Sequence, residues 1–435
     1  MDPVLVGVIG TILVFVLLFM GMPISFSMML VGFLGISVLA SVGAALPVIA
    51  RTTYGVAAFY PYMVMPLFVL MGGFASHTGM TEELYNTFDK WFRKLPGGLG
   101  VTTIAACAGF AAVSGSSVAT AAAMGKIALP QMRRFEYDQS LATGCIAAGG
   151  TLGFLIPPSI GFVVYGILTE QSIGALLVAG MVPGLILAFA YIMIVVIRVK
   201  INPDLAPGNP EPVSLREKIR AFTGIWEPLG IFLLVMGGIY RGFFTPTEAG
   251  AIGATALFVV ALIKRKLNWK NLTGALLEAA RLAAMVQFLV IGAVIFSYFL
   301  ALSTIPMKVA SWVGGLETSP YMIHAIIILL YLFLGCFMDV LSMLVLTMPV
   351  IFPVIVELGF NPIWFGVIAV LVMEAGLITP PVGLNIFTVA GVAPDIPIEK
   401  IFRGTAPFLI SIIFMVILIT IFPQIALFLP TMMFH

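Results

Sequence analysis

Two double prolines, each inside an apolar stretch, constrain what this chain can fold into more than any other feature. They are Pro157-Pro158 and Pro380-Pro381, and they lie 223 residues apart. Proline cannot continue a helix, because it lacks the backbone N–H and its ring clashes with the carbonyl four residues earlier. Each surrounding stretch is long enough to cross a bilayer. The sequence therefore predicts two broken membrane helices in matching halves, a pattern typical of transporters that bind their cargo at the membrane midplane.

The composition is that of a membrane protein, since 61% of the 435 residues are hydrophobic and 9% are charged. Apolar runs of spanning length recur from end to end, which predicts an all-α polytopic fold in a lipid bilayer. The three cysteines are an odd count in apolar segments, so we interpret them as packing residues. The sequence has no P-loop, nucleophile elbow or zinc-binding helix, so neither an enzymatic activity nor an organic cofactor is expected. Nothing in it indicates a nucleic-acid partner.

Apolar length and helical periodicity divide the chain into ten crossing segments. These are 4–22, 24–46, 62–80, 138–168, 172–198, 225–240, 247–263, 275–303, 362–392 and 405–429. The predicted organisation is scaffold helices at 1–61, a first repeat at 62–200, a cytoplasmic loop at 201–224, scaffold helices at 225–263, a second repeat at 275–404 and a C-terminal helix at 405–435.

Two further segments, 97–134 and 320–358, are too long for loops and carry polar residues at their centres. We predict that both are re-entrant hairpins, which bilayers tolerate where the turn is buried in protein or lines a wet cavity. The 223-residue offset aligns Ser116 in the first turn with Asp339 in the second. The amphipathic segment 81–95 is either an arm helix in the interface plane or an ordinary loop helix.

Charge distribution tests this topology. With both hairpins re-entrant, 17 of the 21 lysines and arginines fall on one side of the membrane. The positive-inside rule makes that side cytoplasmic. The first hairpin then enters from the cytoplasm and the second from outside, so the halves are inverted repeats and both termini lie on the periplasmic side. If either hairpin crossed fully, the charge bias would collapse.

The first half offers hard oxygen ligands at its turn and its break. Ser114 and Ser116 are opposed to Gly149 and Thr151. Hydroxyl and carbonyl oxygens, without thiolate or imidazole, suit a hard cation such as Na⁺. The alternative is close packing of small residues, which is common between membrane helices.

The second half adds two carboxylates at the predicted membrane depth, Asp339 and Glu374. Ionisable groups there are costly and indicate function, as cation ligands or proton carriers. The alternative for Asp339 is that it only caps a hairpin helix. No arginine lies at the site, so anion binding is expected to rest on helix N-termini, amides and hydroxyls.

These motifs resemble the large membrane subunit of tripartite ATP-independent periplasmic (TRAP) transporters, over essentially the whole chain. The resemblance rests on SGSSVATAAAMGKIALPQM at 114–132, GGTLGFLIPPSI at 149–160, TPTEAGA at 245–251, MDVLSMLVLTMPVIFPV at 338–354 and EAGLITPPVGLN at 374–385. It implies an elevator-type transporter in the bacterial inner membrane that imports organic acids, such as C4-dicarboxylates or sialic acids, with sodium. It also implies a periplasmic substrate-binding protein and a small membrane subunit on a separate chain.

The resemblance also implies site residues. The implied sodium ligands are Ser114, Ser116, Gly149 and Thr151 in the first half and Asp339, Glu374, Gly376 and Thr379 in the second. The implied substrate-binding residues are Ser117, Gly150, Pro158, Pro381 and Asn385. Three other functions stay open on the residues alone: a proton-coupled carrier of similar architecture, a channel, and a membrane-embedded enzyme.

Overall fold

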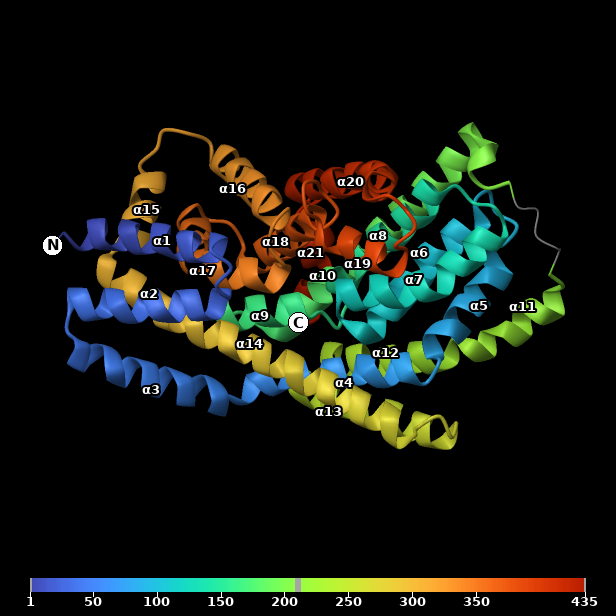
Figure 1. The fold of residues 1–435 in the computed structure, drawn as a ribbon, viewed down its shortest axis with the longest axis horizontal. Helices are drawn as coiled ribbons and strands as arrows, with labels where there is room; N and C mark the ends of the chain where they lie inside the picture. The colour runs from blue at the N-terminus through green and yellow to red at the C-terminus, as the bar shows by residue number, and fades with distance from the viewer. Residues whose placement is uncertain (1, 208–212, 434–435) are drawn as a thin grey trace.

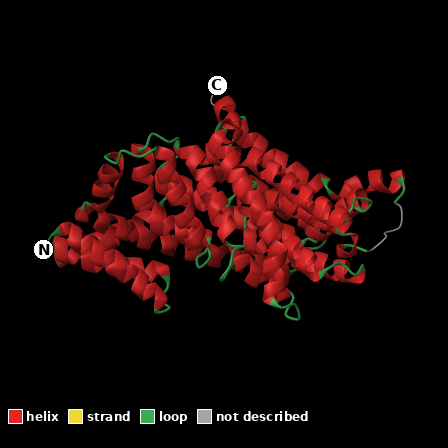
Figure 2. Ribbon diagram, turned by 90° about the horizontal axis from the view of Figure 1, so that it is seen from above, coloured by secondary structure: helices red, strands yellow, loops and turns green. Residues whose placement is uncertain are grey.

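The computed structural model describes residues 2–207 and 213–433, and within those ranges the ordered elements are all helical (Figures 1 and 2). The prediction of an all-α polytopic protein is therefore confirmed. Six stretches are long and apolar enough to cross a membrane, and two sharply bent helix pairs raise the number to eight. Residues 208–212 of the predicted 201–224 loop lie outside the described residues.

The first half contains ten α-helices. They are α1 (Pro3–Phe19), α2 (Ile24–Leu39), α3 (Val42–Ala58), α4 (Val64–His77), α5 (Met80–Phe92), α6 (Gly98–Ser114), α7 (Ser117–Arg134), α8 (Gln139–Leu155), α9 (Ile160–Thr169) and α10 (Ile173–Ile201). The second half has α12 (Trp226–Tyr240), α13 (Pro246–Ile263), α14 (Trp269–Ser303), α15 (Ile305–Gly314), α16 (Pro320–Gly335), α17 (Val340–Glu357), α18 (Pro362–Gly376), α19 (Leu384–Val392) and α20 (Ile398–Ile421). The remaining elements are α11 (Leu215–Ala221), α21 (Gln424–Met433) and the short 3₁₀ helices η1 (Tyr60–Met63), η2 (Pro203–Leu205) and η3 (Phe222–Gly224).

The 223-residue offset found at the prolines relates almost the whole chain. It maps the first residues of α1, α7 and α8 onto those of α12, α17 and α18 without any shift. The arm helices α5 and α15 lie at opposite ends of the molecule, each with its own hairpin, α6–α7 or α16–α17 (Figure 1). The repeat is thus longer than the predicted 62–200 and 275–404, because the two scaffold segments belong to it as well.

Each half is braced by a helix pair from the other half. The α1–α2 pair packs along α14, and in the α12–α13 pair α13 packs along α4 while α12 packs on α13 and α6. The contacts are close because small residues face bulky ones: a Cβ added to Gly35 would lie 2.2 Å from the Phe299 ring, and one added to Gly253 would lie 2.5 Å from Met71 Sδ. The halves are therefore interlocked through their scaffold helices rather than joined only by the 201–224 segment.

Both predicted hairpins and both predicted broken helices are present. The hairpins are α6–α7 and α16–α17, and the broken helices are α8–α9 and α18–α19. The two double prolines occupy the breaks, and both Pro–Pro peptide bonds are cis. The segment predicted at 81–95 is helical as α5, and α15 holds the matching place in the second half.

Two predicted segments are wrong in extent. The crossing at 24–46 ends at Leu39, and Ser41 starts the separate helix α3 by accepting a hydrogen bond from the Ala44 N–H (3.1 Å). The crossing at 405–429 begins earlier, at Ile398, so the predicted division between 404 and 405 falls inside α20. The same segment breaks before Pro423, which cannot continue the helix, and α21 follows.

Candidate functional site

The tip of the first hairpin is locked into the first break. Gly115, which joins α6 to α7, has a positive φ of 63°, a conformation that favours glycine. Its carbonyl accepts a hydrogen bond from the Ile160 N–H (3.4 Å) at the start of α9. A Cβ at Gly115 would lie 2.5 Å from the Pro158 carbonyl oxygen. Only glycine therefore allows the hairpin tip to approach the broken helix this closely.

Hydroxyl groups gather at this first tip. Ser116 caps α7 by accepting a hydrogen bond from the Ala119 N–H (3.3 Å). The Ser114 and Thr120 hydroxyls are 2.9 Å apart, and Thr120 also donates to the Ser116 carbonyl (2.7 Å). Gly153 of α8 packs here, because a Cβ on it would lie 2.6 Å from that same carbonyl. The tip thus presents several hard oxygen atoms in a small volume.

The second hairpin makes similar contacts, with the cap and the half-helix N–H at residues related by the 223 offset and the accepting carbonyl two residues earlier than the offset gives. Asp339 caps α17 by accepting from the Ser342 N–H (3.1 Å), as Ser116 caps α7. The Gly383 N–H, at the start of α19, donates to the Cys336 carbonyl in the hairpin turn (3.3 Å). Gly383 is the counterpart of Ile160. Both halves therefore use a half-helix N–H to hold the turn of a hairpin.

A buried polar cluster connects the two halves at their centre. Ser117, the first residue of α7, donates a hydrogen bond to Glu374 Oε1 of α18 (2.5 Å). Asn385 of α19 donates to the Ala147 carbonyl of α8 (3.4 Å). A Cβ on Gly150 would lie 3.1 Å from the Ser117 carbonyl and 3.3 Å from Asn385 Nδ2. The structure thus brings together three predicted substrate-binding residues and one predicted sodium ligand.

Glu374 is only 1% exposed, and two oxygens of this cluster lack partners. Neither Glu374 Oε2 nor Asn385 Oδ1 accepts a hydrogen bond from any described residue. A charged carboxylate buried without a counter-ion is strongly unfavourable. The Glu374 carboxyl group therefore needs either a proton or a bound cation in the folded protein.

Two of the four residues predicted for the first sodium site face away from the hairpin tip. Thr151 shares a hydrogen bond with the Tyr191 hydroxyl of α10 (3.0 Å). Gly149 packs on α6, where a Cβ would lie 2.6 Å from Cys107 Sγ. Ser114 and Ser116 remain at the tip. The reason is helical geometry, because successive residues of α8 point in different directions and the tip meets α8 at Gly153.

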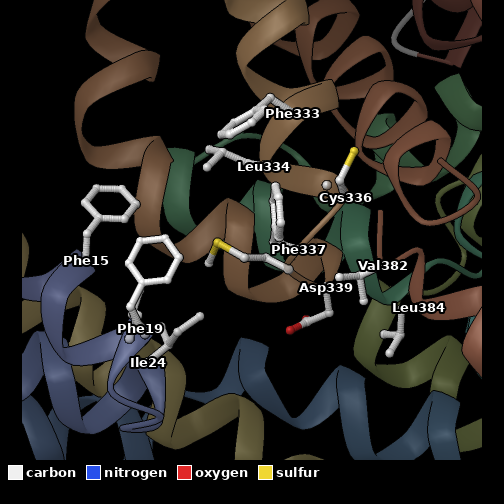
Figure 3. Close-up of a pocket in the computed structure, with 13 residues that line it drawn as sticks. Phe15, Phe19, Ile24, Phe333, Leu334, Cys336, Phe337, Asp339, Val382 and Leu384 are labelled. Atoms are coloured by element: carbon white, nitrogen blue, oxygen red, sulfur yellow. The ribbon is translucent and has the colours of Figure 1, made fainter. Parts of the chain in front are cut away.

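The predicted second sodium site is similarly divided. Asp339 lines a cavity of about 710 Å³, with Val382 and Leu384 near it and Phe15 and Phe19 on the opposite wall (Figure 3). Gly376 instead packs against Gly335, and the Thr379 hydroxyl donates to the Ala375 carbonyl (2.7 Å). Glu374 belongs to the Ser117 cluster described above. The two carboxylates of this predicted site thus have different partners: Asp339 accepts from Ser342 of its own hairpin helix, and Glu374 accepts from Ser117 of the other half.

The proline breaks differ in exposure. Pro158 is buried beneath the first hairpin tip, whereas Pro381 is exposed beside the second.

A second cavity, with a volume of about 420 Å³, reaches the first hairpin tip, and Lys126 is one of its lining residues. Lys126 lies in the segment 97–134 that is predicted as a hairpin, and no role is predicted for it. The available signal is its helical spacing from Ser116, the residue that caps α7 ten positions earlier.

The arm helix α5 is fixed by an ion-pair network. Lys264 Nζ lies 2.6 Å from Glu83 Oε2 and 2.8 Å from Glu227 Oε2. Partial burial raises the pKa of Glu83, but the hydrogen bonds and positive charges of Lys264 and Lys266 together outweigh it, and the net pKa is lowered. Burial likewise opposes the charge of Lys264, while hydrogen bonds to Glu227 and Glu83 give a net raised pKa. These contacts hold α5 to α12 and α13.

Inverted repeats with hairpin tips held in broken helices define a class of membrane transporter folds. A solved structure of this architecture is similar to the chain. It is the YdaH transporter of Alcanivorax borkumensis, described as having an unusual topology, with a TM-score of 0.62, 16% sequence identity and coverage of 88% of this chain and 89% of that one. The likeness supports the fold.

The family follows from sequence comparison. Residues 11–425 match the DctM component of the tripartite ATP-independent periplasmic transporters, and the chain belongs to this family. It is 39% identical to the C4-dicarboxylate TRAP transporter large permease protein DctM of Pseudomonas aeruginosa, over 85% of this chain and 86% of that protein. It is 32% identical to the sialic acid TRAP transporter large permease protein SiaM of Vibrio cholerae, over 95% and 96% respectively.

Family membership confirms the predicted resemblance. The chain is a multi-pass membrane protein of a transporter family, and its relatives are permeases rather than enzymes. One relative, the isethionate TRAP transporter permease protein DctMQ of Oleidesulfovibrio alaskensis, is 34% identical over 98% of this chain but only 66% of its own length.

Proposed function

We propose that the chain is the large membrane subunit of a sodium-coupled secondary transporter that imports organic acids. The relatives' names include C4-dicarboxylate and sialic acid permeases, so a carboxylate is the proposed substrate. The single observation that carries the proposal is the doubled contact between hairpin turn and half-helix, at Ile160 and again at Gly383. Such paired breaks expose backbone groups that bind ions and anions in secondary transporters.

Sodium is the proposed coupling ion, carried as cargo. The oxygen-rich first tip, with Ser114 and Ser116, supports one site, and the Asp339 turn supports another. Backbone carbonyls near Gly149, Thr151, Gly376 and Thr379 complete the proposed ligand sets. The chemistry fits, because these are uncharged or carboxylate oxygens of the kind that hard cations prefer.

The substrate carboxylate is proposed to bind between the two breaks, near Pro158 and Pro381. The N-termini of α7, α9, α17 and α19 all begin around the hairpin turns and the breaks. A helix N-terminus presents free N–H groups and the positive end of its dipole, which favour an anion. Ser117, Gly150 and Asn385 are proposed to shape the inner wall of this site.

The remaining proposals concern the assembly. A separate small membrane subunit and a periplasmic substrate-binding protein are the proposed partners, and the tripartite family description supports both. The single-chain DctMQ relative, which extends beyond the match to this chain, is consistent with a small-subunit partner. We place the chain in the bacterial inner membrane with both termini periplasmic, on the charge distribution. Movement of hairpins and broken helices against the scaffold, as an elevator, is the proposed route of alternating access.

Transport by the reconstituted assembly tests the function. The large subunit, the small subunit and the binding protein are placed in proteoliposomes, and uptake of labelled succinate and sialic acid is followed with and without an inward sodium gradient. Uptake of one of them that requires both sodium and the binding protein supports the proposal. Uptake that is undiminished without sodium contradicts the coupling.

A proton-coupled carrier is the second candidate, and the buried Glu374 carboxyl group favours it. Its Oε2 atom has no hydrogen-bond partner among the described residues, and a proton would neutralise the group as well as a cation. Glu374→Gln keeps the size and the contact with Ser117 but cannot exchange a proton. Uptake driven by a pH gradient alone, and abolished in this variant, would support proton coupling over sodium.

A further inference from the structure

A cavity of about 420 Å³ extends from the first hairpin tip along one face of α7. Its inner end is lined by Ser114 and Ser116, which belong to the proposed sodium site. Its opposite wall, called the scaffold wall below, comes from α4, which has 14 residues, and α14, which has 35. The cavity therefore separates the hairpin from these two helices and leads away from the tip.

The face of α7 that lines this cavity has a simple pattern. After Ser116, the lining residues on this helix are Ala119, Ala122, Ala123, Lys126 and Ile127, which recur at helical spacing. The three alanines project only a methyl group into the space. A strip of small side chains thus runs from the hydroxyl groups of the tip to Lys126 and Ile127 at its outer end.

Lys126 is exposed and forms no ion pair within residues 2–207 and 213–433. The other titratable groups that line the cavity, His77 and Glu278, come from the scaffold wall. A lysine ammonium group is a compact, mobile positive charge, which suits a transient contact with a carboxylate. Because Lys126 lies at the end of the alanine strip far from the tip, its position suits the passage of a carboxylate rather than its tight retention.

The corresponding cavity in the second half lacks this charge. It is the cavity of about 710 Å³ described above, where Phe333, Phe337 and Asp339 hold the places that Phe110, Ser114 and Ser116 hold under the 223 offset. Its described lining includes Asp339 but no lysine or arginine. The positive charge is therefore specific to the side on which most lysines and arginines of the chain are predicted to lie.

We propose that the alanine face of α7 and Lys126 form the release path along which an organic anion bound near Pro158 passes the first hairpin tip toward the cytoplasm. The ligand class is a carboxylate, and this inference rests on the proposed function. Lys126 attracts the departing carboxylate, and Ala119, Ala122 and Ala123 leave room for it.

Exchange kinetics on the two sides of the membrane test the path. In proteoliposomes of known orientation, Lys126→Gln should raise the KM for succinate, or for whichever acid the wild type transports, on the cytoplasmic side by about tenfold, as expected for a lost charge-assisted hydrogen bond. The KM for uptake from the periplasmic side should stay within about twofold, because that route does not use this cavity. Lys126→Arg should restore the cytoplasmic KM. The matched control is Lys200→Gln, an exposed lysine at the end of α10 that lines neither cavity.

Thiol labelling gives a second readout that does not need a transported substrate. The three native cysteines are buried, so an Ala122→Cys variant supplies the reactive thiol. It should react from the lysine-rich side faster with an anionic methanethiosulfonate than with a cationic one. Adding Lys126→Gln should remove that preference.

The outcomes separate this inference from the proposed function. A thiol at 122 that does not react from the lysine-rich side, or a reagent preference that is unchanged by Lys126→Gln, overturns the path even if sodium-driven uptake is intact. An unchanged cytoplasmic KM in Lys126→Gln overturns it as well. Sodium-independent uptake by the wild type would instead refute the coupling and leave the labelling result standing.

Discussion

The two halves of this chain share one backbone plan and differ in the chemistry placed on it. In the first half the break is buried, at Pro158, and the position that corresponds to Glu374 is Thr151. In the second half the break at Pro381 is exposed, and Glu374 crosses to the first half to accept from Ser117. A duplicated scaffold therefore fixes where turns and breaks meet, while single substitutions decide which groups meet there.

The helices that pack beside the hairpins also differ between the two halves. Helix α14 runs unbroken for 35 residues, whereas its counterpart is divided into α3 and α4, with a bend of 54° between Val42–Ala58 and Tyr60–His77. Pro61 and Pro66 lie at the bend, and the offset maps them onto Ala284 and Leu289. Proline at the start of a helix is tolerated but cannot continue the helix before it. Proline at these two positions thus accounts for two helices, α3 and α4, where the second half has the single long helix α14.

The largest expected effect is at the first tip. Gly115→Ala should abolish uptake and lower stability by about 2 kcal/mol, because alanine is disfavoured at positive φ and its Cβ would contact the Pro158 carbonyl. Uptake and the melting temperature of the purified protein measure this. The matched control is Met338→Ala, at the same place in the second hairpin, where the turn carries a side chain already. Equal losses of uptake and stability in Gly115→Ala and Met338→Ala would mean that the two hairpin tips have the same need for a small residue.

The next effect concerns the cluster between the halves. Glu374→Gln should reduce uptake by more than about tenfold, because it removes a buried charge or proton that the transport cycle needs. Thr151→Val, at the corresponding position, should lose the hydroxyl contacts with Tyr191 and with the Ala148 carbonyl and destabilise the protein by about 1 kcal/mol. Initial uptake rates, measured with equal amounts of each variant in the membrane, test this prediction. A larger transport defect in Thr151→Val would reverse the comparison.

The arm helices give a third test. Lys264→Met should destabilise the protein by roughly 2 kcal/mol, because it leaves Glu227, which is 4% exposed, without its cation. Glu227→Gln in the same chain should recover part of the loss. The matching arm α15 has Pro306 where α5 has Glu83, so α15 lacks the equivalent of this ion pair. Melting temperatures of the single and double variants measure the coupling; strict additivity would contradict it.

Acid should weaken the same clamp. The pKa of Glu83 is lowered in the folded protein, so its stabilising contribution is complete above the unfolded pKa near 4.5 and is lost as the pH falls through the lower folded value. The melting temperature of the wild type should therefore fall below about pH 4.5 more steeply than that of Glu83→Gln. Parallel curves for the two proteins would rule out this contribution.

The smallest effect is expected where the halves meet at the surface. Arg133 Nη2 contacts both carboxylate oxygens of Asp395 at 2.7 and 2.9 Å, which lowers the pKa of that carboxyl group. Both side chains are exposed, and exposed ion pairs contribute little to stability. Asp395→Asn should leave the melting temperature unchanged. A clear fall would show that this contact also holds the halves together.

Much of the architecture was predictable from particular residues. The double prolines and the polar turns around Ser116 and Asp339 gave the breaks and hairpins, because proline and polar groups have few tolerated places in an apolar helix. The helix end at Leu39 and the break before Pro423 were missed. The apolar pattern runs through both without interruption, so periodicity alone gives no boundary there.

The site was predictable as a set of segments but not as a set of neighbours. Asp339 and Glu374 were grouped because both are intramembrane carboxylates, yet Glu374 is bonded to Ser117 from the other half. Lys126 was set aside as an arm residue, yet it lines the cavity that starts at the first tip. In both cases the partner lies on a different helix, and helix rotation decides which side chains meet.

The order of helices, the two breaks and the inverted repetition of the chain follow from its amino-acid sequence alone, since they depend on proline geometry, apolar length and charge placement that act locally. The pairing of Ser117 with Glu374, the burial of one break and the exposure of the other follow only from the tertiary structure. They depend on how helices from separate halves pack side by side, and close packing is a property of the assembled molecule rather than of any one segment.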